Sequence, residues 1–175
     1  MSLSGYVAFE IIRRQPQRLA RLVLMVTTAV ADHPARKAGR LSDIATLREG
    51  GIEALIPELL SRWLWPAHAL EPEPVNLMDD MARSVSARSQ LNQQTAMLAR
   101  LDSHDELDTV TVPTLVVCGR QDPVTPLADH VAIAARVAGS RLRVIEDCGH
   151  LATIEQPLAV NQVLAEWLHD TATPE

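Results

Sequence analysis

Two short runs of β-branched and aliphatic residues constrain the fold of this chain more than any other feature. Thr114–Cys118 ends in a polar turn that contains Asp122, and Leu142–Ile145 ends in a polar turn that contains His150. The spacing between the turns leaves room for one helix and one strand. A strand, a helix and a second strand in this order predict a parallel sheet with helices on its faces, so the two turns should be neighbours at one sheet edge.

An aspartate and a histidine in neighbouring turns are two members of a hydrolytic triad. A serine hydroxyl is a weak nucleophile at neutral pH, so it needs a histidine base, and the base needs a carboxylate that fixes its tautomer. Ser2 is the candidate nucleophile in this chain. His150 would take the proton of Ser2, and Asp122 would accept a hydrogen bond from the other ring nitrogen.

Three segments resemble the α/β-hydrolase family, in its esterase and lactonase branch. The start of the chain, SLSGYVA, is similar to the family's nucleophile elbow, G-x-S-x-G, from the serine onward. Met1 takes the place before the nucleophile, and Ser4 stands where the family has a glycine. GRQDPVTP is similar to the family's acid turn and DCGHLATIEQP to its histidine turn, and the order serine, acid, histidine is also that of the family.

The resemblance implies the C-terminal half of an α/β-hydrolase fold, beginning at the nucleophile elbow. It predicts an α/β fold with about three parallel strands, flanking helices and a helical cap. Residues 1–40 would form the elbow helix and the following strand, and residues 41–105 would form the cap. Residues 106–175 would complete the core and carry the acid and histidine turns.

The activity implied by the resemblance is hydrolysis of a carboxylic ester or a lactone through an acyl-enzyme on Ser2, without a cofactor. The backbone N–H of Leu3, the residue after the nucleophile, would donate to the oxyanion. The usual second donor lies on an earlier loop, and this chain has no such loop. A serine at the elbow argues against the haloalkane dehalogenase and epoxide hydrolase branches, which need an aspartate there.

Two other functions remain open at this point. One is a non-catalytic hydrolase-like protein or fragment, which keeps the acid and histidine turns but lacks a working elbow. The other is a cofactor-free perhydrolase or C–C hydrolase with the same triad. A serine-directed fluorophosphonate probe separates the first alternative from an enzyme, because labelling requires an activated serine.

Each member of the triad has a rival. Asp32 is a rival acid because it follows the apolar run 22–26. Ser4 is a rival nucleophile, but that register would place Ser2 and a tyrosine where the elbow has its glycines. Removal of the initiator methionine would give Ser2 a free amine as base, and the neighbouring acid and histidine turns argue against this reading.

The first forty residues predict one helix and one strand. Gly5–Arg14 carries an apolar stripe at helical spacing, and Pro16 closes the helix. Leu22–Val26 is a continuous apolar run, typical of a parallel strand that is buried on both faces. Thr27–Arg40 contains a proline and a glycine and is expected to be an exit loop.

The middle of the chain predicts helices only. Ser42 and Asp43 can open a short helix that Gly50-Gly51 ends. A second helical run follows, and the prolines between 66 and 74 then break the chain. Residues 75 to about 101 predict a long helix in one or two pieces.

The large side chains of the predicted cap allow two interpretations. Trp63, Trp65 and a stripe of methionines could line a pocket for an acyl group. The alternative is ordinary packing between helices, and in a cap both can hold.

The last third predicts two helices around the second short strand. Thr125 is expected to cap a helix that Pro126 begins and Gly139 ends. A final helix is expected over Pro157–His169. Five further histidines show no metal-ligand spacing, and most are expected to be solvated. They are His33, His68, His104, His130 and His169.

Composition limits the partners. The net charge of −6 argues against a nucleic-acid surface. No apolar run has the roughly 18 residues that cross a membrane, and the N-terminus does not read as a signal peptide, so a cytoplasmic protein is expected. Cys118 and Cys148 are either a redox pair or two small buried hydrophobic residues in a reduced compartment.

The chain is expected to be incomplete as a hydrolase and to be inactive, or nearly so, alone. Only Met1 precedes Ser2, so the strand that holds the elbow serine is absent, and a terminal serine frays. Leu22–Val26 would then be a sheet edge with unpaired N–H and C=O groups. The candidates to cover this edge are an upstream N-terminal half, a separate partner chain or a second copy in a homodimer.

Overall fold

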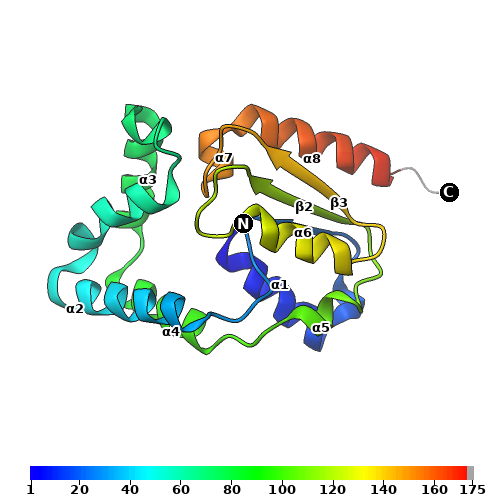
Figure 1. The fold of residues 1–175 in the computed structure, drawn as a ribbon, viewed down its shortest axis with the longest axis horizontal. Coiled ribbons are helices and arrows are strands. Elements are labelled where there is room, and N and C mark those ends of the chain that lie inside the picture. The colour runs from blue at the N-terminus through cyan, green and yellow to red at the C-terminus, as the bar shows by residue number, and fades with distance from the viewer. Residues whose placement is uncertain (173–175) are drawn as a thin grey trace.

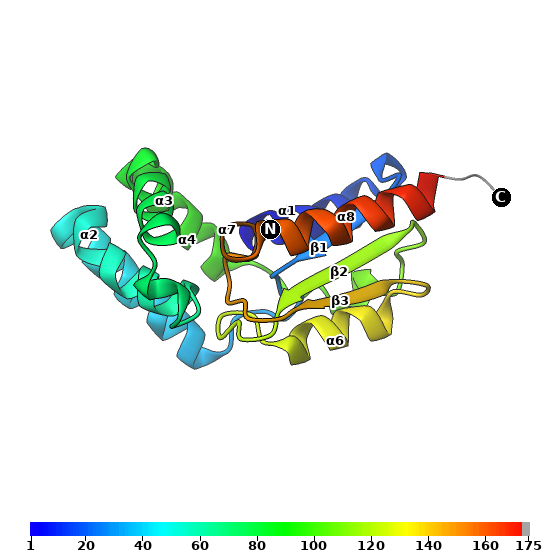
Figure 2. The same cartoon turned by 90° about the horizontal axis from the view of Figure 1, so that it is seen from above.

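A parallel sheet of three strands forms the centre of the protein in the computed structural model, which describes residues 1–172. The strands are β1 (Leu22–Met25), β2 (Thr114–Gly119) and β3 (Arg141–Ile145), and they lie side by side in chain order (Figures 1 and 2). Leu24 pairs with Val116 across the first ladder. The three predicted strands and their parallel order are confirmed, with ends that differ by one residue.

Helices cover both faces of this sheet because the strand residues on each face are apolar (Figure 1). On one face the strands pack against α1 (Leu3–Arg14), α6 (Leu127–Arg136) and the short α5 (His104–Leu107). On the other face they pack against α8 (Pro157–Ala172). All six residues of β2 are buried, so this strand is the middle of the core.

Three helices lie beyond the carboxyl ends of the strands (Figure 2), and we refer to them as the cap. These helices are α2 (Pro34–Trp63), α3 (Pro72–Ser84) and α4 (Ala87–Ala99), and the one-turn helix η2 (His68–Leu70) joins the first two. They share their own apolar cluster, which also includes Leu151 from the histidine turn. The three helices therefore have an apolar core of their own, which contacts the histidine turn.

Several expected boundaries in the first half are wrong. The exit loop predicted over Thr27–Arg40 ends at His33, because Pro34 starts α2 and the His33 ring accepts a hydrogen bond from the backbone of Arg36. A proline is well tolerated at a helix start, where its missing N–H has no partner to lose. The short helix expected from Ser42 begins earlier, at Pro34. Gly51, with φ 69° and ψ −166°, interrupts the helical backbone as expected, so α2 is two helical segments joined at a kink.

The break expected over the prolines between 66 and 74 is present between Trp63 and Pro72, and it is shorter than expected because Pro72 begins α3. The long helix expected after it forms in two pieces, α3 and α4, as one version of the prediction has it.

Both ends of the helix α6 also differ from expectation. Pro126, not Thr125, occupies its N-cap position, and the helix ends at Arg136. Thr125 instead turns its hydroxyl to Asp122.

Four short helices in the described residues were not expected. They are η1 (Pro16–Arg18) after α1, η2, α5, and α7 (Ala152–Glu155) in the histidine turn.

The described sheet has two edges, β1 and β3, each of which pairs with β2 alone. Within residues 1–172, no helix has the length and apolar character needed to span a membrane. The cover of the β1 edge and the domain boundaries after residues 40 and 105 stay predictions.

Candidate active site

Ser2 is the residue directly before α1, in a strained turn that lies against the end of β1. Its φ of 49° and ψ of −114° lie outside the regions that residues with side chains usually adopt. Two backbone bonds hold it there: its N–H donates to the Met25 carbonyl at 2.9 Å, and its carbonyl accepts from Thr27 Oγ1 at 3.1 Å. A serine on such a sharp turn is the geometry of a nucleophile elbow.

Gly5 allows α1 to approach the chain after β1. A Cβ on Gly5 would lie 2.2 Å from Thr27 Oγ1, so only glycine fits. Ser4 is tolerated in the place of the family's glycine because its side chain is exposed and donates to the Met1 carbonyl at 2.7 Å. The elbow therefore keeps the close contact that it needs at Gly5 and not at Ser4.

Asp122 is fixed by its own turn. Oδ1 accepts from the N–H groups of Val124 and Thr125 at 2.8 and 3.0 Å, and Oδ2 accepts from Thr125 Oγ1 at 2.6 Å. Burial opposes the negative charge of Asp122, but hydrogen bonds from His150 and Thr125 outweigh it and hold the pKa of this carboxyl below its ordinary value. Asp122 is therefore a buried anion at neutral pH.

His150 lies between Asp122 and Ser2. Its Nδ1 is 2.8 Å from Asp122 Oδ2, and its Nε2 is 2.9 Å from Ser2 Oγ. The histidine turn comes close to the acid strand because Gly119, at the end of β2, has no side chain: a Cβ there would lie 2.2 Å from the Gly149 carbonyl. The structure thus brings together the three residues that the sequence analysis named for catalysis.

The rivals lie elsewhere. Asp32 is buried and paired with Arg40 and with Arg100, whose NH2 lies 2.7 Å from Asp32 Oδ1. Burial alone would raise the pKa of Asp32, but these two arginines hold it below its ordinary value. Ser4 bonds to Met1, not to His150. These contacts do not favour Asp32 as the acid or Ser4 as the nucleophile.

Glu155 ties the histidine turn to the cap, and sequence reasoning missed it. Its fully buried carboxylate accepts from the backbone N–H groups of Gly149, Leu151 and Trp65 at 2.8–3.1 Å, and it lies 3.0 Å from His68 Nδ1. The only sequence signal was an acidic residue five positions after His150, inside an otherwise apolar stretch.

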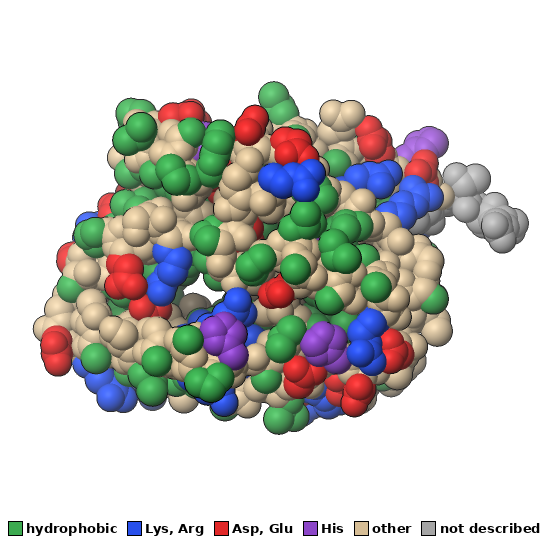
Figure 3. Space-filling view, in the orientation of Figure 1, with side chains coloured by type: hydrophobic (Ala, Val, Ile, Leu, Met, Phe, Trp, Pro, Cys, Tyr) green, Lys and Arg blue, Asp and Glu red, His purple; other side chains and the backbone are tan. Residues whose placement is uncertain are grey.

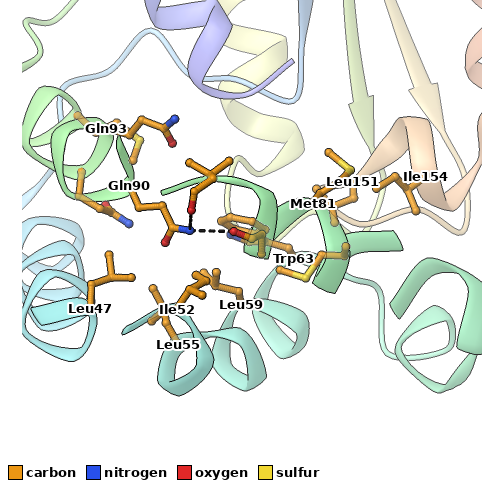
Figure 4. A pocket seen from close by; sticks show the side chains of 15 residues that line it. Leu47, Ile52, Leu55, Leu59, Trp63, Met81, Gln90, Gln93, Leu151 and Ile154 are labelled. Atoms are coloured by element: carbon orange, nitrogen blue, oxygen red, sulfur yellow. Dashed lines mark hydrogen bonds between the residues drawn. The ribbon is translucent and has the colours of Figure 1, made fainter. Parts of the chain in front are cut away.

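A cavity of about 450 Å³ lies over Ser2 and His150, between core and cap. Trp63 is one wall, with its ring centroid 6.3 Å from that of His150. Trp63 also borders a second, apolar cavity of about 230 Å³ inside the cap. Figure 4 shows this second cavity, with Gln90 bonded to the carbonyls of Ala82 and Val85 at one side.

The large cap residues could either line a pocket or only pack between helices, and the cavities show which of them line a pocket. Trp63 and three methionines line the apolar cavity, so helix packing and a pocket coexist there. Trp65 does not line it and stacks edge-on against His68 at 5.2 Å. The methionines are Met78, Met81 and Met97.

Three of the five other histidines, His33, His104 and His169, are exposed or partly exposed, as expected for most of them, and two are exceptions. His68 is buried beside Glu155, and His130 is fully buried in α6, where its Nε2 accepts from the Thr27 N–H at 3.1 Å. Burial lowers the pKa of His130. Within residues 1–172, no group of three or more histidines, cysteines or acidic residues is arranged to hold a metal ion.

Cys118 and Cys148 are both buried and free. Burial raises the pKa of Cys118 to about 11 and that of Cys148 to about 12. Both are therefore neutral thiols at physiological pH, which fits small hydrophobic residues better than a reactive pair.

A serine, a histidine and an aspartate in hydrogen-bond sequence at the carboxyl ends of a parallel sheet, with the serine on a strained turn before a helix, are the arrangement of the α/β-hydrolase class. A family model described as "Alpha/beta hydrolase family" matches residues 1–163. The chain belongs to this family.

Known relatives agree on the family. The chain is 28% identical to the 3-oxoadipate enol-lactonase 2 of Acinetobacter baylyi over 94% of its length and 60% of the relative's. It is 30% identical to a pimeloyl-[acyl-carrier protein] methyl ester esterase of Aromatoleum aromaticum, over 89% of its length and 67% of the relative's. Among solved structures, it is 33% identical to a thermophilic esterase from Thermogutta terrifontis, with a TM-score of 0.92.

The chain is shorter than these proteins. It spans 60% of the lactonase and 64% of the thermophilic esterase chain, although 99% of the chain itself is covered in that structural comparison.

Proposed function

We propose that this chain carries the catalytic residues of a serine hydrolase that cleaves carboxylic esters or lactones. The observation that carries the proposal is the continuous line of contacts from Ser2 Oγ to His150 Nε2, at 2.9 Å, and from His150 Nδ1 to Asp122, at 2.8 Å. These distances let a proton pass from the serine to the histidine without rearrangement.

In the first half-reaction, Ser2 Oγ attacks the carbonyl carbon of the ester while His150 Nε2 takes the serine proton. Asp122, already ionised, stabilises the imidazolium that forms. When the tetrahedral intermediate collapses, the bond to the alcohol oxygen breaks, and His150 gives its proton to that oxygen. The acyl group stays on Ser2.

The second half-reaction regenerates the serine. His150 takes a proton from water, the resulting hydroxide attacks the acyl carbon, and the bond to Ser2 Oγ breaks. The carboxylic acid leaves, and Ser2 recovers its proton from His150. No cofactor enters either half.

Leu3 is the proposed oxyanion donor. It is the first residue of α1, so its N–H has no acceptor within the helix, and it lines the cavity over Ser2. The positive end of the helix dipole adds to its effect on a developing oxyanion.

The relatives support the bond type. The enol-lactonase and the two esterases named above act on lactone or ester bonds by their names. An ester or lactone of a small molecule is therefore the proposed substrate class, and location in the cytoplasm stays a prediction.

The test is hydrolysis of short p-nitrophenyl esters and of δ-lactones by the purified 175-residue chain, with Ser2→Ala as the reference. Hydrolysis above the Ser2→Ala rate supports the proposal. Equal rates, with both proteins folded by circular dichroism and no fluorophosphonate adduct on Ser2 of the wild type, would favour the non-catalytic alternative.

A further inference from the structure

The cavity over Ser2 is basic, although the chain as a whole is acidic. The net charge of the protein is −6, yet three arginines line this cavity against one carboxylate, that of Asp43. Figure 3 shows the molecule hollowed between cap and core, with basic side chains at the rim of the hollow. The arginines around this cavity therefore contrast with the negative net charge of the chain.

The three arginines, Arg36, Arg40 and Arg62, differ in how far their charge is already neutralised. Arg40 is paired with the buried Asp32 and also donates to Gln94. The charge of Arg40 is therefore largely neutralised by the buried Asp32.

Arg62 lies near two carboxylates, at 2.9 Å from Asp43 and 3.6 Å from Glu58. Its buried Nε has no hydrogen-bond partner in the described structure. The charge of Arg62 is therefore shared with two carboxylates, and its unpartnered Nε is buried away from solvent.

Arg36 is the least neutralised of the three. The nearest carboxylate oxygen that pairs with it, on Asp32, is 4.0 Å away, and that carboxylate already serves Arg40 and Arg100. Its printed side-chain hydrogen bond goes to a neutral group, the Val124 carbonyl, at 2.7 Å. This bond holds the guanidinium two residues from Asp122, and 23% of the side chain is exposed.

We propose that the substrate carries a negatively charged group, such as a carboxylate, which Arg36 binds in the cavity over Ser2. This inference rests on the proposed function, because it treats this cavity as the substrate site. A guanidinium forms charge-assisted hydrogen bonds with a carboxylate, often through two donors at once. The chain would then prefer the ester or lactone of a molecule that has a second acid group.

The cap supplies room for the rest of such a molecule. Trp63, Gln93, Gln94 and Met97 border both the basic cavity and the apolar cavity of about 230 Å³. An acid with an aliphatic portion could place its charge at Arg36 and its apolar carbons along Trp63.

The test measures binding without catalysis. The Ser2→Ala chain is titrated calorimetrically with adipamate, an anion whose amide resists hydrolysis, and with 6-methylheptanamide, in which an isopropyl group replaces the carboxylate. We expect adipamate to bind roughly tenfold more tightly or better, the effect of one charge-assisted hydrogen bond. The difference should shrink in high salt.

Substitutions assign the preference to one residue. In the Ser2→Ala background, Arg36→Gln should reduce the preference for adipamate to less than about twofold, and Arg36→Lys should retain part of it because the charge remains. Arg48→Gln is the matched control, since Arg48 is exposed on the same helix and lines neither cavity. Unchanged melting temperatures would separate loss of charge from loss of structure.

The outcomes separate this inference from the proposed function. Equal affinity for both probes, no measurable binding of either, or a preference that survives Arg36→Gln would each overturn the inference. A preference for adipamate that depends on Arg36, in a folded chain whose wild type neither hydrolyses an ester nor forms a fluorophosphonate adduct on Ser2, would overturn the proposed function and leave the anion site in place.

Discussion

The acid–histidine half of the site and the serine half are held by different means. Asp122 accepts four hydrogen bonds, three of them within its own turn, and the backbone N–H of His150 is bonded to Trp63 of the cap at 2.8 Å. Ser2 depends on two bonds to residues 23 and 25 positions away, Met25 and Thr27, and on a strained backbone.

This difference shows which part of a triad is locally encoded. The acid turn positions its own carboxylate and would keep it in place if the surrounding contacts loosened. The serine is positioned by the end of β1, so its geometry depends on tertiary structure. Disturbing the serine half should therefore change reactivity, whereas disturbing the supports of the acid–histidine half should also change stability.

The largest effect is expected from the serine itself. Ser2→Ala should reduce ester hydrolysis to the background of the assay, since no other hydroxyl contacts His150 Nε2 in the described residues. Ser4→Ala should keep a measurable part, because Ser4 bonds only to Met1. Initial rates with a p-nitrophenyl ester measure both variants. Loss confined to Ser4→Ala would reverse the assignment of the elbow.

Two aspartates sharpen the comparison. Asp122→Asn should lower the rate by on the order of 10⁴, as for a serine protease acid. Asp32→Asn should instead lower the free energy of unfolding by about 3 kcal/mol, because it leaves Arg40 and Arg100 buried without an anion. Rates and urea unfolding of the two variants give the two quantities. A large loss of rate in a stable Asp32→Asn protein would move the acid to the end of β1.

The Glu155 carboxylate, which links the histidine turn to the cap, can be altered by replacing one of its oxygens with nitrogen. Glu155→Gln puts an NH₂ group where one carboxylate oxygen accepts bonds, and it should cost about 1–3 kcal/mol of stability together with part of the activity. Glu166→Gln, on the exposed face of α8, is the control and should stay within about 0.5 kcal/mol. Equal melting temperatures for both variants would mean that Glu155 does not support the turn.

The smallest effect concerns pH. Cys118 and Cys148 ionise near 11 and 12 when folded but near 8.5 when unfolded, so above about pH 8.5 the unfolded state loses its protons first. Their contribution to stability is complete below that pH and is lost as pH rises toward 11. The urea midpoint should fall between pH 8 and pH 10, less so in a double cysteine-to-alanine variant. A midpoint that does not change with pH would show that the thiols are not buried as described.

The sequence was sufficient for the parts of the fold with local signals. The two β-branched runs and their polar turns are strand and turn signals that do not depend on distant residues, and Asp122 and His150 follow from them. The start of α2 was missed because Pro34 is compatible with both a loop and a first helical turn. The roles of Arg36 and Glu155 were missed because a charged residue looks the same in sequence whether it is solvated or buried.

The surroundings of Ser2 could be predicted from the sequence only in part. The elbow pattern located the serine, but its positive φ and the contact between Gly5 and Thr27 are tertiary features. The expectation that the chain alone has little or no activity stays a prediction. This expectation concerns the rate of repeated ester hydrolysis. A single covalent modification of Ser2 can still accumulate over time, even if the reaction is slow.

Covalent labelling is the most direct measurement of whether His150 and Asp122 activate Ser2, because it does not require turnover. The 175-residue chain is treated with a fluorophosphonate, and the modified residue is located by intact-mass and peptide mass spectrometry. One adduct per chain is expected, on Ser2, with none on Ser2→Ala and a strongly reduced rate on His150→Ala. An unmodified folded wild-type chain, an adduct on another serine, or labelling that does not depend on His150 would contradict the account.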